Sequence, residues 1–188
     1  MKIWRELLGY VKLIVIVVAI TLVINNVVLI NAKIPSPSME KTLMVKDRLF
    51  GFRLAYGINL NLFGYEISEK FKDPERFDIV IFKYPDDESR LFIKRVIGLP
   101  GETVQIKNGQ IYIDDKPLEA DKGLGQVSLA GLAENPVVLE EDEYFLLGDN
   151  RDSSEDSRFV KIGNVKRRQI RGKVWLRLIP FIDFKLVE

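Results

Sequence analysis

The strongest hydrophobic pattern in the chain is an uncharged run near the amino end. Residues 13–32 form 20 consecutive positions without a charged side chain, most of them Leu, Ile or Val. As an α-helix at about 1.5 Å per residue, such a run covers about 30 Å, which matches the hydrocarbon core of a bilayer. Only Thr21, Asn25 and Asn26 interrupt the apolar surface, so the polar face of a soluble helix is missing. The pattern predicts a transmembrane helix over 13–32.

A cleaved secretory signal is the main alternative to a retained anchor. The apolar part of such a signal is ordinarily about 7 to 15 residues long and ends in small residues at a cut site. Here Ile30 and Asn31 precede Ala32, which is a poor exit. Basic residues are more numerous before the run than after it: Lys2, Arg5 and Lys12 against Lys33. The positive-inside rule therefore predicts residues 1–12 in the cytoplasm and 33–188 outside it.

Beyond this run, short apolar segments alternate with turns, a pattern typical of a mainly β domain. The predicted strands are 77–83, 91–97, 103–107, 110–113, 143–147 and 173–178. Asn108-Gly109 supplies residues that tolerate positive φ, so a tight hairpin is expected there. The Gly- and Ala-rich segment 115–136 is expected to be a surface excursion. The apolar segment 49–65, broken by Gly and Asn, fits either an irregular covering of the core or a surface that dips into lipid.

Composition narrows the chemistry more than length does. The 188 residues include no histidine and no cysteine, which excludes histidine-based triads, thiol nucleophiles, disulfides and the usual zinc ligand sets. A serine nucleophile then needs a lysine, a carboxylate, a tyrosine or a terminal amine to activate it. The net charge of +1 gives no global field for nucleic acid, and the basic run 166–168 is short, so no nucleic-acid partner is expected.

The segment 35–42, PSPSMEKT, contains a candidate nucleophile with a candidate base nearby. Ser38 and Lys41 have the S-x-x-K spacing, which sets the two groups one helical turn apart in penicillin-binding proteins and class A β-lactamases. Those enzymes also need S-D-N and K-T-G elements. Here Lys41-Thr42 is not followed by glycine, and the nearest S-D-N relative, at 148–150, lacks its serine. The local pair is one hypothesis, and a distant base is the other.

Two adjacent cations, Lys94 and Arg95, interrupt the apolar run 91–97. Strand alternation puts them on opposite faces, so one of them must enter apolar surroundings. Arginine stays charged, whereas a desolvated lysine loses its proton at an accessible pH; lowering a lysine pKa from ~10.4 to ~8 costs about 3 kcal/mol. The alternative is a lysine whose stem packs on the sheet while its amine reaches water.

A dense polar segment, 148–158, directly follows the predicted strand 143–147. A solvated loop is the ordinary interpretation, and a calcium loop is excluded because the carboxylates miss the D-x-[DN]-x-[DN]-G spacing. No metal site is expected. We interpret the segment as a hydrogen-bonded scaffold, in which serine hydroxyls orient a neutral amine and a bidentate Asp–Arg pair locks the loop.

Taken together, four segments resemble the bacterial type I signal peptidases, the Ser/Lys leader peptidases. The matching segments are 34–39 with Thr42-Leu43, 78–82, 93–101 and 148–158. Their order and approximate spacing agree along nearly the whole chain, the anchor included. The resemblance implies a mostly β catalytic domain that sits against the membrane, with a small β extension at about 102–142.

The resemblance also implies roles for individual residues. Ser38 corresponds to the nucleophile and Lys94 to its general base. Ser36 corresponds to the residue whose hydroxyl assists the Ser38 amide in stabilising the oxyanion, and Ser154 to the serine that positions the lysine amine. The remaining matches are expected to brace the site: Asp156 with Arg158, and Asp149 beside them.

Three residues depart from the pattern of the signal peptidases. Pro37 replaces a common glycine and stiffens the backbone before the nucleophile. Lys41 replaces a proline and adds a cation, which disfavours protonation of Lys94 if the two approach. Phe77 replaces the glycine of an Arg-Gly-Asp pattern. None of the three removes a catalytic side chain, so activity is expected.

The resemblance implies a serine endopeptidase of the bacterial plasma membrane that acts without a cofactor through an acyl-enzyme. Its substrates would be secretory preproteins with small residues at the first and third positions before the cut. Membrane lipid is the other expected partner, and the oligomeric state is left open. Two alternatives remain: a membrane peptidase of this family dedicated to one substrate, and an inactive tethered binding module. The self-cleaving repressors share a related Ser/Lys fold but carry a DNA-binding domain in place of a membrane span.

Overall fold

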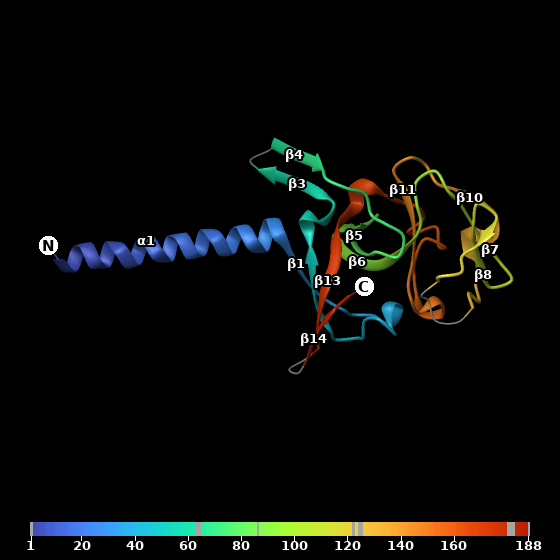
Figure 1. The fold of residues 1–188 in the computed structure, drawn as a ribbon, viewed down its shortest axis with the longest axis horizontal. Helices are drawn as coiled ribbons and strands as arrows, with labels where there is room; N and C mark the ends of the chain where they lie inside the picture. The colour runs from blue at the N-terminus through green and yellow to red at the C-terminus, as the bar shows by residue number, and fades with distance from the viewer. Residues whose placement is uncertain are drawn as a thin grey trace.

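The chain folds into a body of β-strands from which one long helix extends (Figure 1). In this computed structural model the described residues are 2–62, 65–85, 87–121, 123, 126–179 and 183–187. Over these residues the only α-helix is α1, Lys2–Val23, and the remaining regular structure is mostly strand. The mainly β class predicted from the apolar pattern is confirmed.

The helix predicted over 13–32 is wrong at its carboxyl end, and the observed helix also extends toward the amino end of the chain. Helix α1 begins eleven residues earlier, and after the π-helical segment η1, Ile24–Val28, the chain becomes strand β1, Leu29–Lys33. Strand β1 pairs with β2, Arg48–Phe52, and its Ile30 is buried in the body. An absence of charge marks an apolar stretch, but it does not distinguish a helix in lipid from a strand that packs on a core.

Within α1, the segment Trp4–Val23 is long and apolar enough to cross a membrane. Its most apolar stretch of 18 residues has a mean hydropathy of 2.3, and none of that stretch is buried against the body. An apolar helix with every side exposed has no protein surface to cover it, which favours lipid as its surroundings. The apolar segment that fits a span therefore lies closer to the amino end than the run 13–32.

Eight strands form the main sheet in the order β1-β2-β13-β5-β6-β11-β12, with β14 paired to β13. The further strands are β5 Ile79–Tyr84, β6 Asp87–Gly98, β11 Glu143–Leu147, β12 Val165–Lys166, β13 Ile170–Ile179 and β14 Asp183–Leu186. Strand β5 is apolar on both faces because the core lies on both sides of it. Val80 and Phe82 join one buried cluster, whereas Ile79 and Ile81 join another.

Four predicted strands lie in this sheet and are confirmed with altered limits: 77–83, 91–97, 143–147 and 173–178. Strand β5 starts two residues late because Phe77 has a φ of 73°, which interrupts extended backbone. Strands β1, β2, β12 and β14 were not predicted. All four are at most five residues long, and β1 overlaps the end of the uncharged run.

A second sheet of four strands packs against the carboxyl-terminal half of β11, in the order β10-β7-β8-β9. Its strands are β7 Thr103–Lys107, β8 Gln110–Ile113, β9 Lys116–Pro117 and β10 Val137–Val138. Asn108 and Gly109 have φ values of 51° and 77°, as a two-residue hairpin turn of type I′ requires. The predicted hairpin is confirmed, and all four strands fall within 102–142.

The segment 115–136 is not simply a surface excursion, and that prediction is wrong for two of its residues. Val127 and Ala133 are buried in the cluster that joins the second sheet to β11. Ala133 belongs to a short 3-10 helix, Gly131–Glu134. A composition rich in Gly and Ala predicted exposure, but small side chains also fit the close approach between elements of a core.

The segment 49–65 is not an irregular covering of the core. It contains the end of β2, the 3-10 turn η3, Arg53–Ala55, and strand β3, Gly57–Leu62, which pairs with β4, Tyr65–Lys70. The β3–β4 hairpin projects beyond the main sheet on the side where α1 joins the body (Figure 1). Residues 63 and 64 of the predicted segment lie outside the described residues, and lipid contact here stays a prediction.

Candidate active site

Ser38 lies in η2, a single turn of 3-10 helix at Pro37–Met39. Pro37 takes the first helical position, where a missing N–H costs nothing and the fixed φ fits. Met39 and Leu43 are fully buried in the cluster that lies under β1 and β5. These apolar anchors hold the turn on the body, and Ser38 itself is 6% exposed. The Pro37 departure is thus compatible with the local backbone.

Lys94, on β6, points at Ser38 although 56 positions separate the two residues. Its Nζ donates a hydrogen bond of 2.9 Å to Ser38 Oγ and one of 3.1 Å to the Ile93 carbonyl. The Lys94 side chain is 4% exposed, and its Nζ lies 5.5 Å from the centre of the Phe92 ring. The amine therefore does not reach out to water, and the alternative of a lysine with a solvated amine is wrong.

The surroundings of Lys94 favour a neutral amine. Burial lowers the pKa of Lys94 from 10.5 to about 8, although the negative charges of Asp156, Glu155 and Asp149 oppose this shift. Lys94 forms no ion pair with any described residue. Because desolvation disfavours the ammonium form and no contacting carboxylate compensates it, the proton is held weakly. This is the state in which a lysine can accept a proton from a hydroxyl near neutral pH.

Arg95 points to the opposite face of β6 and is also buried, with 1% exposure. It makes two parallel hydrogen bonds to Asp149, from Nε to Oδ1 at 2.8 Å and from Nη2 to Oδ2 at 2.7 Å. Thr42 donates its hydroxyl proton to the same carboxylate. Both cations of the pair are therefore buried, which sequence alternation alone did not predict. Asp149 thus braces Arg95 and the nucleophile turn, whereas its expected association with Asp156 and Arg158 stays a prediction.

The predicted pair of Asp156 and Arg158 forms inside the polar loop. Arg158 donates from Nε to Asp156 Oδ1 at 2.8 Å and from Nη2 to Asp156 Oδ2 at 2.9 Å, and both residues are buried. Asp156 Oδ2 also accepts the Gly148 amide proton at 3.1 Å. Such a bidentate pair fixes both ends of the loop, because it ties Arg158 to the residue that follows strand β11.

The two accessory serines lie beside Ser38, but their contacts differ. Ser36 Oγ is 3.3 Å from Ser38 Oγ. Ser154 is buried, and its hydroxyl forms no hydrogen bond with a described residue. A Cβ on Gly148 would lie 2.2 Å from Ser154 Oγ and 2.5 Å from the Ser38 carbonyl, so only glycine fits between them. Ser154 is therefore packed into the site, while its role in positioning the amine stays a prediction.

Lys41 is exposed and is not one helical turn from Ser38, because η2 ends at Met39. The chain instead makes a turn in which Thr42 N donates to the Met39 carbonyl and Lys41 has a φ of 92°. This φ belongs to the third position of a type II turn, which favours glycine and which proline cannot adopt. The S-x-x-K hypothesis is wrong for this fold, since Lys94 occupies the place of the base.

Several bracing residues were missed from the sequence. Arg151 is buried, donates from Nε to the Gly148 carbonyl at 2.9 Å and pairs with Asp121. Asp121 lies in the segment predicted to be surface, so nothing marked it as a partner. The Ser38 carbonyl accepts the Asn150 amide proton at 3.1 Å, which joins the nucleophile turn to the loop. The one sequence feature that could have indicated these bracing residues was the high density of polar residues directly after the strand 143–147.

Ser38 and Lys94 lie at the end of a cleft of about 590 Å³. One wall is the segment 32–36, and the other is the part of β6 at 90–94. Strand β6 pairs with β11 only at Arg95, Val96 and Gly98, so this pairing stops where the cleft begins. The cleft thus lies between two segments of extended chain and leads to the serine and the amine.

Comparison with known proteins agrees with this architecture. The model of the family described as "Signal peptidase, peptidase S26" matches residues 7–179. A "Signal peptidase I" of Pseudomonas aeruginosa is 32% identical over 90% of this chain and 72% of its own length. One from Rickettsia bellii is 33% identical over 78% of this chain and 65% of its own. The matched region is thus less than two thirds of the Rickettsia protein.

A crystal structure of a signal peptidase I from Enterococcus faecalis V583 is 33% identical, with a TM-score of 0.44 over 55% of this chain and 98% of its own. Because the family match covers almost the whole chain, the chain belongs to the signal peptidase family, peptidase S26. The resemblance to the type I signal peptidases is confirmed by relatives of that name at about one third identity.

Proposed function

We propose that the chain is a membrane-anchored serine endopeptidase that removes signal peptides from secretory preproteins. The observation that carries this proposal is the 2.9 Å contact between Ser38 Oγ and a buried Lys94 amine at the end of an open cleft. A serine hydroxyl is a weak nucleophile until a base takes its proton, and a desolvated lysine is such a base. Family membership supplies the substrate class.

The reaction begins when neutral Lys94 accepts the hydroxyl proton of Ser38 while Oγ attacks the carbonyl carbon of the scissile peptide. Negative charge then develops on the carbonyl oxygen, and the Ser38 amide and the Ser36 hydroxyl stabilise it. Protonated Lys94 returns its proton to the departing amine, which leaves an ester on Ser38. A water that gives its proton to Lys94 hydrolyses this acyl-enzyme and restores the free serine.

The shape of the cleft supports an extended peptide as the substrate. The walls at 32–36 and 90–94 are themselves extended chain, so a peptide between them can add as a further strand. Ile34 and Ile93 give the cleft apolar walls close to Ser38. Narrow apolar walls suit the small side chains expected at the first and third positions before the cut.

The anchor supports a substrate that is itself in the membrane. Segment Trp4–Val23 is long enough to span the bilayer, and the proposal keeps the amino end in the cytoplasm and the body outside. Confinement to one membrane surface raises the effective concentration of enzyme and substrate. A dedicated-substrate peptidase or an inactive binding module would have the same anchor, so substrate cleavage is the property to test.

The test is to incubate the purified full-length chain with several unrelated preproteins and to sequence the amino end of each product. We expect one cut per preprotein, after small residues, and no product with Ser38→Ala or Lys94→Ala. Lys41→Ala is the matched control, and we expect it to retain most of the activity because Lys41 is exposed. Cleavage of a single preprotein would indicate a dedicated peptidase, and cleavage of none by a folded chain would overturn the proposal.

A further inference from the structure

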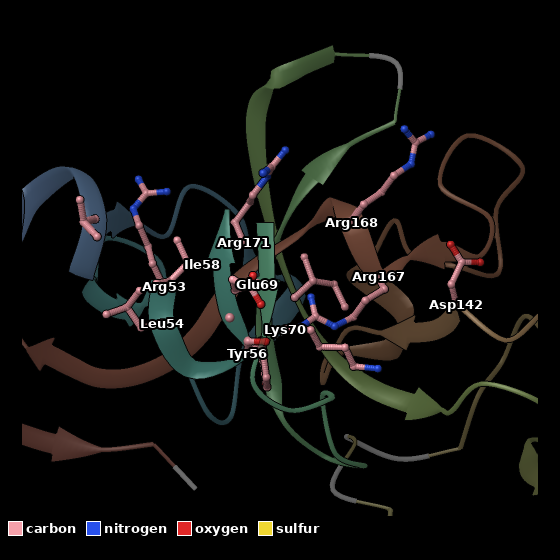
Figure 2. A pocket seen from close by; sticks show the side chains of 13 residues that line it. Arg53, Leu54, Tyr56, Ile58, Glu69, Lys70, Asp142, Arg167, Arg168 and Arg171 are labelled. Carbon is pink, nitrogen blue, oxygen red and sulfur yellow. Dashed lines mark hydrogen bonds between the residues drawn. The ribbon is translucent and has the colours of Figure 1, made fainter. Parts of the chain in front are cut away.

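A pocket of about 320 Å³ lies where the anchor meets the body (Figure 2). Its walls come from five places in the chain: η1, η3, the β3–β4 hairpin, Asp142 just before β11, and the segment 167–171 at the start of β13. We call it the arginine pocket, after Arg53, Arg167, Arg168 and Arg171 that line it. The proposed mechanism uses none of these residues.

The arginine pocket is electropositive even after its internal ion pairs are counted. Five basic side chains line it, the four arginines and Lys70, together with two carboxylates, Glu69 and Asp142. Asp73 contacts both Lys70, at 2.8 Å, and Arg167, at 3.5 Å. The lining residues and Asp73 together comprise five cations and three carboxylates, a formal charge of +2, and neither Arg53 nor Arg168 forms an ion pair with a described residue. An unbalanced cluster of this kind favours an anion.

Arg53 and Arg171 are close enough to disfavour each other's charge. Burial, and then the charge of Arg171, lower the pKa of Arg53 from its usual value. Arg53 Nε donates to the Leu29 carbonyl at 3.1 Å, and its two Nη groups form no hydrogen bond with a described residue. In Figure 2 the guanidinium groups of Arg53, Arg171 and Arg168 extend to the same side. Planar guanidinium groups bind the oxygens of a phosphate through paired hydrogen bonds.

The position of the pocket along the membrane normal indicates that the phosphate belongs to a lipid headgroup. Val27, which lines the pocket, comes four residues after the candidate span ends at Val23. At about 1.5 Å per residue this is about 6 Å beyond the hydrocarbon edge, within the headgroup layer. An apolar hollow of about 450 Å³ beside the same end of the anchor is lined by Phe52 and the half-exposed Trp175. Exposed aromatic rings are typical of this layer.

We propose that the arginine pocket binds the phosphate of an anionic lipid headgroup. A zwitterionic headgroup carries its own cation, which a pocket of net charge +2 repels, so an anionic lipid is preferred. Because the pocket joins the anchor to β13, the bound lipid would fix the height and rotation of the catalytic body over the bilayer. The inference rests on the proposed anchoring of α1, and it assigns no step of the cleavage reaction to the lipid.

The test is native mass spectrometry of the purified full-length chain in neutral detergent with equal amounts of phosphatidylglycerol and phosphatidylcholine. We expect the chain to retain phosphatidylglycerol about tenfold better, and Arg53→Gln/Arg171→Gln to abolish this preference. Arg48→Gln removes an exposed arginine of β2 outside the pocket, and we expect it to behave as the unaltered chain does. Arg168→Gln removes an exposed side chain without hydrogen bonds to described residues, so it tests the pocket without a risk to folding.

Three results would overturn the proposal: equal retention of the two lipids, full retention in both Arg168→Gln and the double variant, or equal losses in Arg48→Gln. Addition of inorganic phosphate distinguishes a lipid site from a free-anion site. A free-anion site would bind inorganic phosphate in the unaltered chain and not in the double variant, and it would show no preference between the two lipids. Alkaline extraction of membranes tests anchoring separately. A chain that is extracted contradicts the anchor, whereas a retained chain without lipid preference contradicts only the pocket.

Discussion

Lys94 and Arg95 are neighbours on one strand, and they show two different ways to bury a cation. Arg95 faces a carboxylate and forms two parallel hydrogen bonds with Asp149, at 2.8 and 2.7 Å. Lys94 faces a hydroxyl, and the carboxylates around it do not contact its amine closely enough to form an ion pair. Both side chains are almost fully buried. The difference therefore lies in the partner and not in the burial.

The consequence of this difference is a division of tasks between the two faces of β6. A paired guanidinium stays charged and joins the nucleophile turn to the loop through Thr42 and Asp149. An unpaired amine loses its proton readily and is free to take one from Ser38. Burial of a charge normally destabilises a fold. The ion pair with Asp149 offsets this desolvation cost for Arg95, whereas Lys94 has no such partner, so its desolvation weakens proton binding and makes the amine a better base.

The largest effect on activity is expected when each of the two cations is replaced by the other type of basic residue. Lys94→Arg keeps a positive charge but cannot be deprotonated, so we expect kcat/KM to fall by about 10²–10⁴-fold. Arg95→Lys keeps a cation beside Asp149 and should retain most of the rate, with weaker bracing. Steady-state cleavage of one preprotein measures both. A Lys94→Arg enzyme within about tenfold of the unaltered rate would show that no neutral amine is needed.

The next effect concerns the braced face alone. Asp149→Ala leaves Arg95 buried without its carboxylate, and we expect the free energy of unfolding to fall by about 3–5 kcal/mol. Denaturant titration of the chain in detergent measures this. Ser153→Ala is the matched control, since Ser153 is exposed in the same loop and should change stability by no more than about 0.5 kcal/mol. Equal effects of the two changes would contradict the assigned role of Asp149.

The smallest effect concerns the stability cost of the Lys94 face, and it has a defined pH dependence. The pKa of Lys94 is about 8 in the fold against 10.5 for an ordinary lysine, so the unfolded chain binds more protons between these values. The stability of the native chain should therefore rise with pH over that window. Lys94→Met removes the cost, and at pH 7 we expect it to stabilise the fold by up to about 3 kcal/mol.

Thermal unfolding of Lys94→Met and the unaltered chain at pH 7 and pH 10 gives the comparison. The gain in stability should be largest at pH 7 and shrink as the pH rises toward 10.5. A variant that is less stable than the unaltered chain at pH 7 would contradict a desolvated amine. It would mean that Lys94 makes a net favourable contact when charged.

The apolar pattern predicted most of the central strands, because β5, β11 and the part of β6 at 91–97 are mainly apolar runs bounded by polar residues. It also put Lys94 and Arg95 on opposite faces, which the structure confirms. The end of the anchor was wrong because residues 29–32 continue the uncharged run, and only their pairing with β2 makes them a strand. Pairing of this kind depends on distant residues.

The partners of the two cations were harder to predict for the same reason. Asp149 meets Arg95 because the register of β11 on β6 sets Leu147 opposite Arg95, two residues before Asp149. Spacing along the chain carries no such register, so the sequence could not identify Arg95 as the partner of Asp149. The pairing of Ser38 with Lys94 was predicted from family resemblance, whereas local spacing alone pointed to Lys41.

The pH dependence of kcat/KM for preprotein cleavage tests the central claim most directly, because it reports the protonation of the free enzyme's base. With a Lys94 pKa of about 8, kcat/KM should rise about tenfold per pH unit below that value and level off above it. A rate that stays constant from pH 6 to pH 10 would contradict a neutral Lys94 as the base. So would a rise whose midpoint lies near the 10.5 of an ordinary lysine.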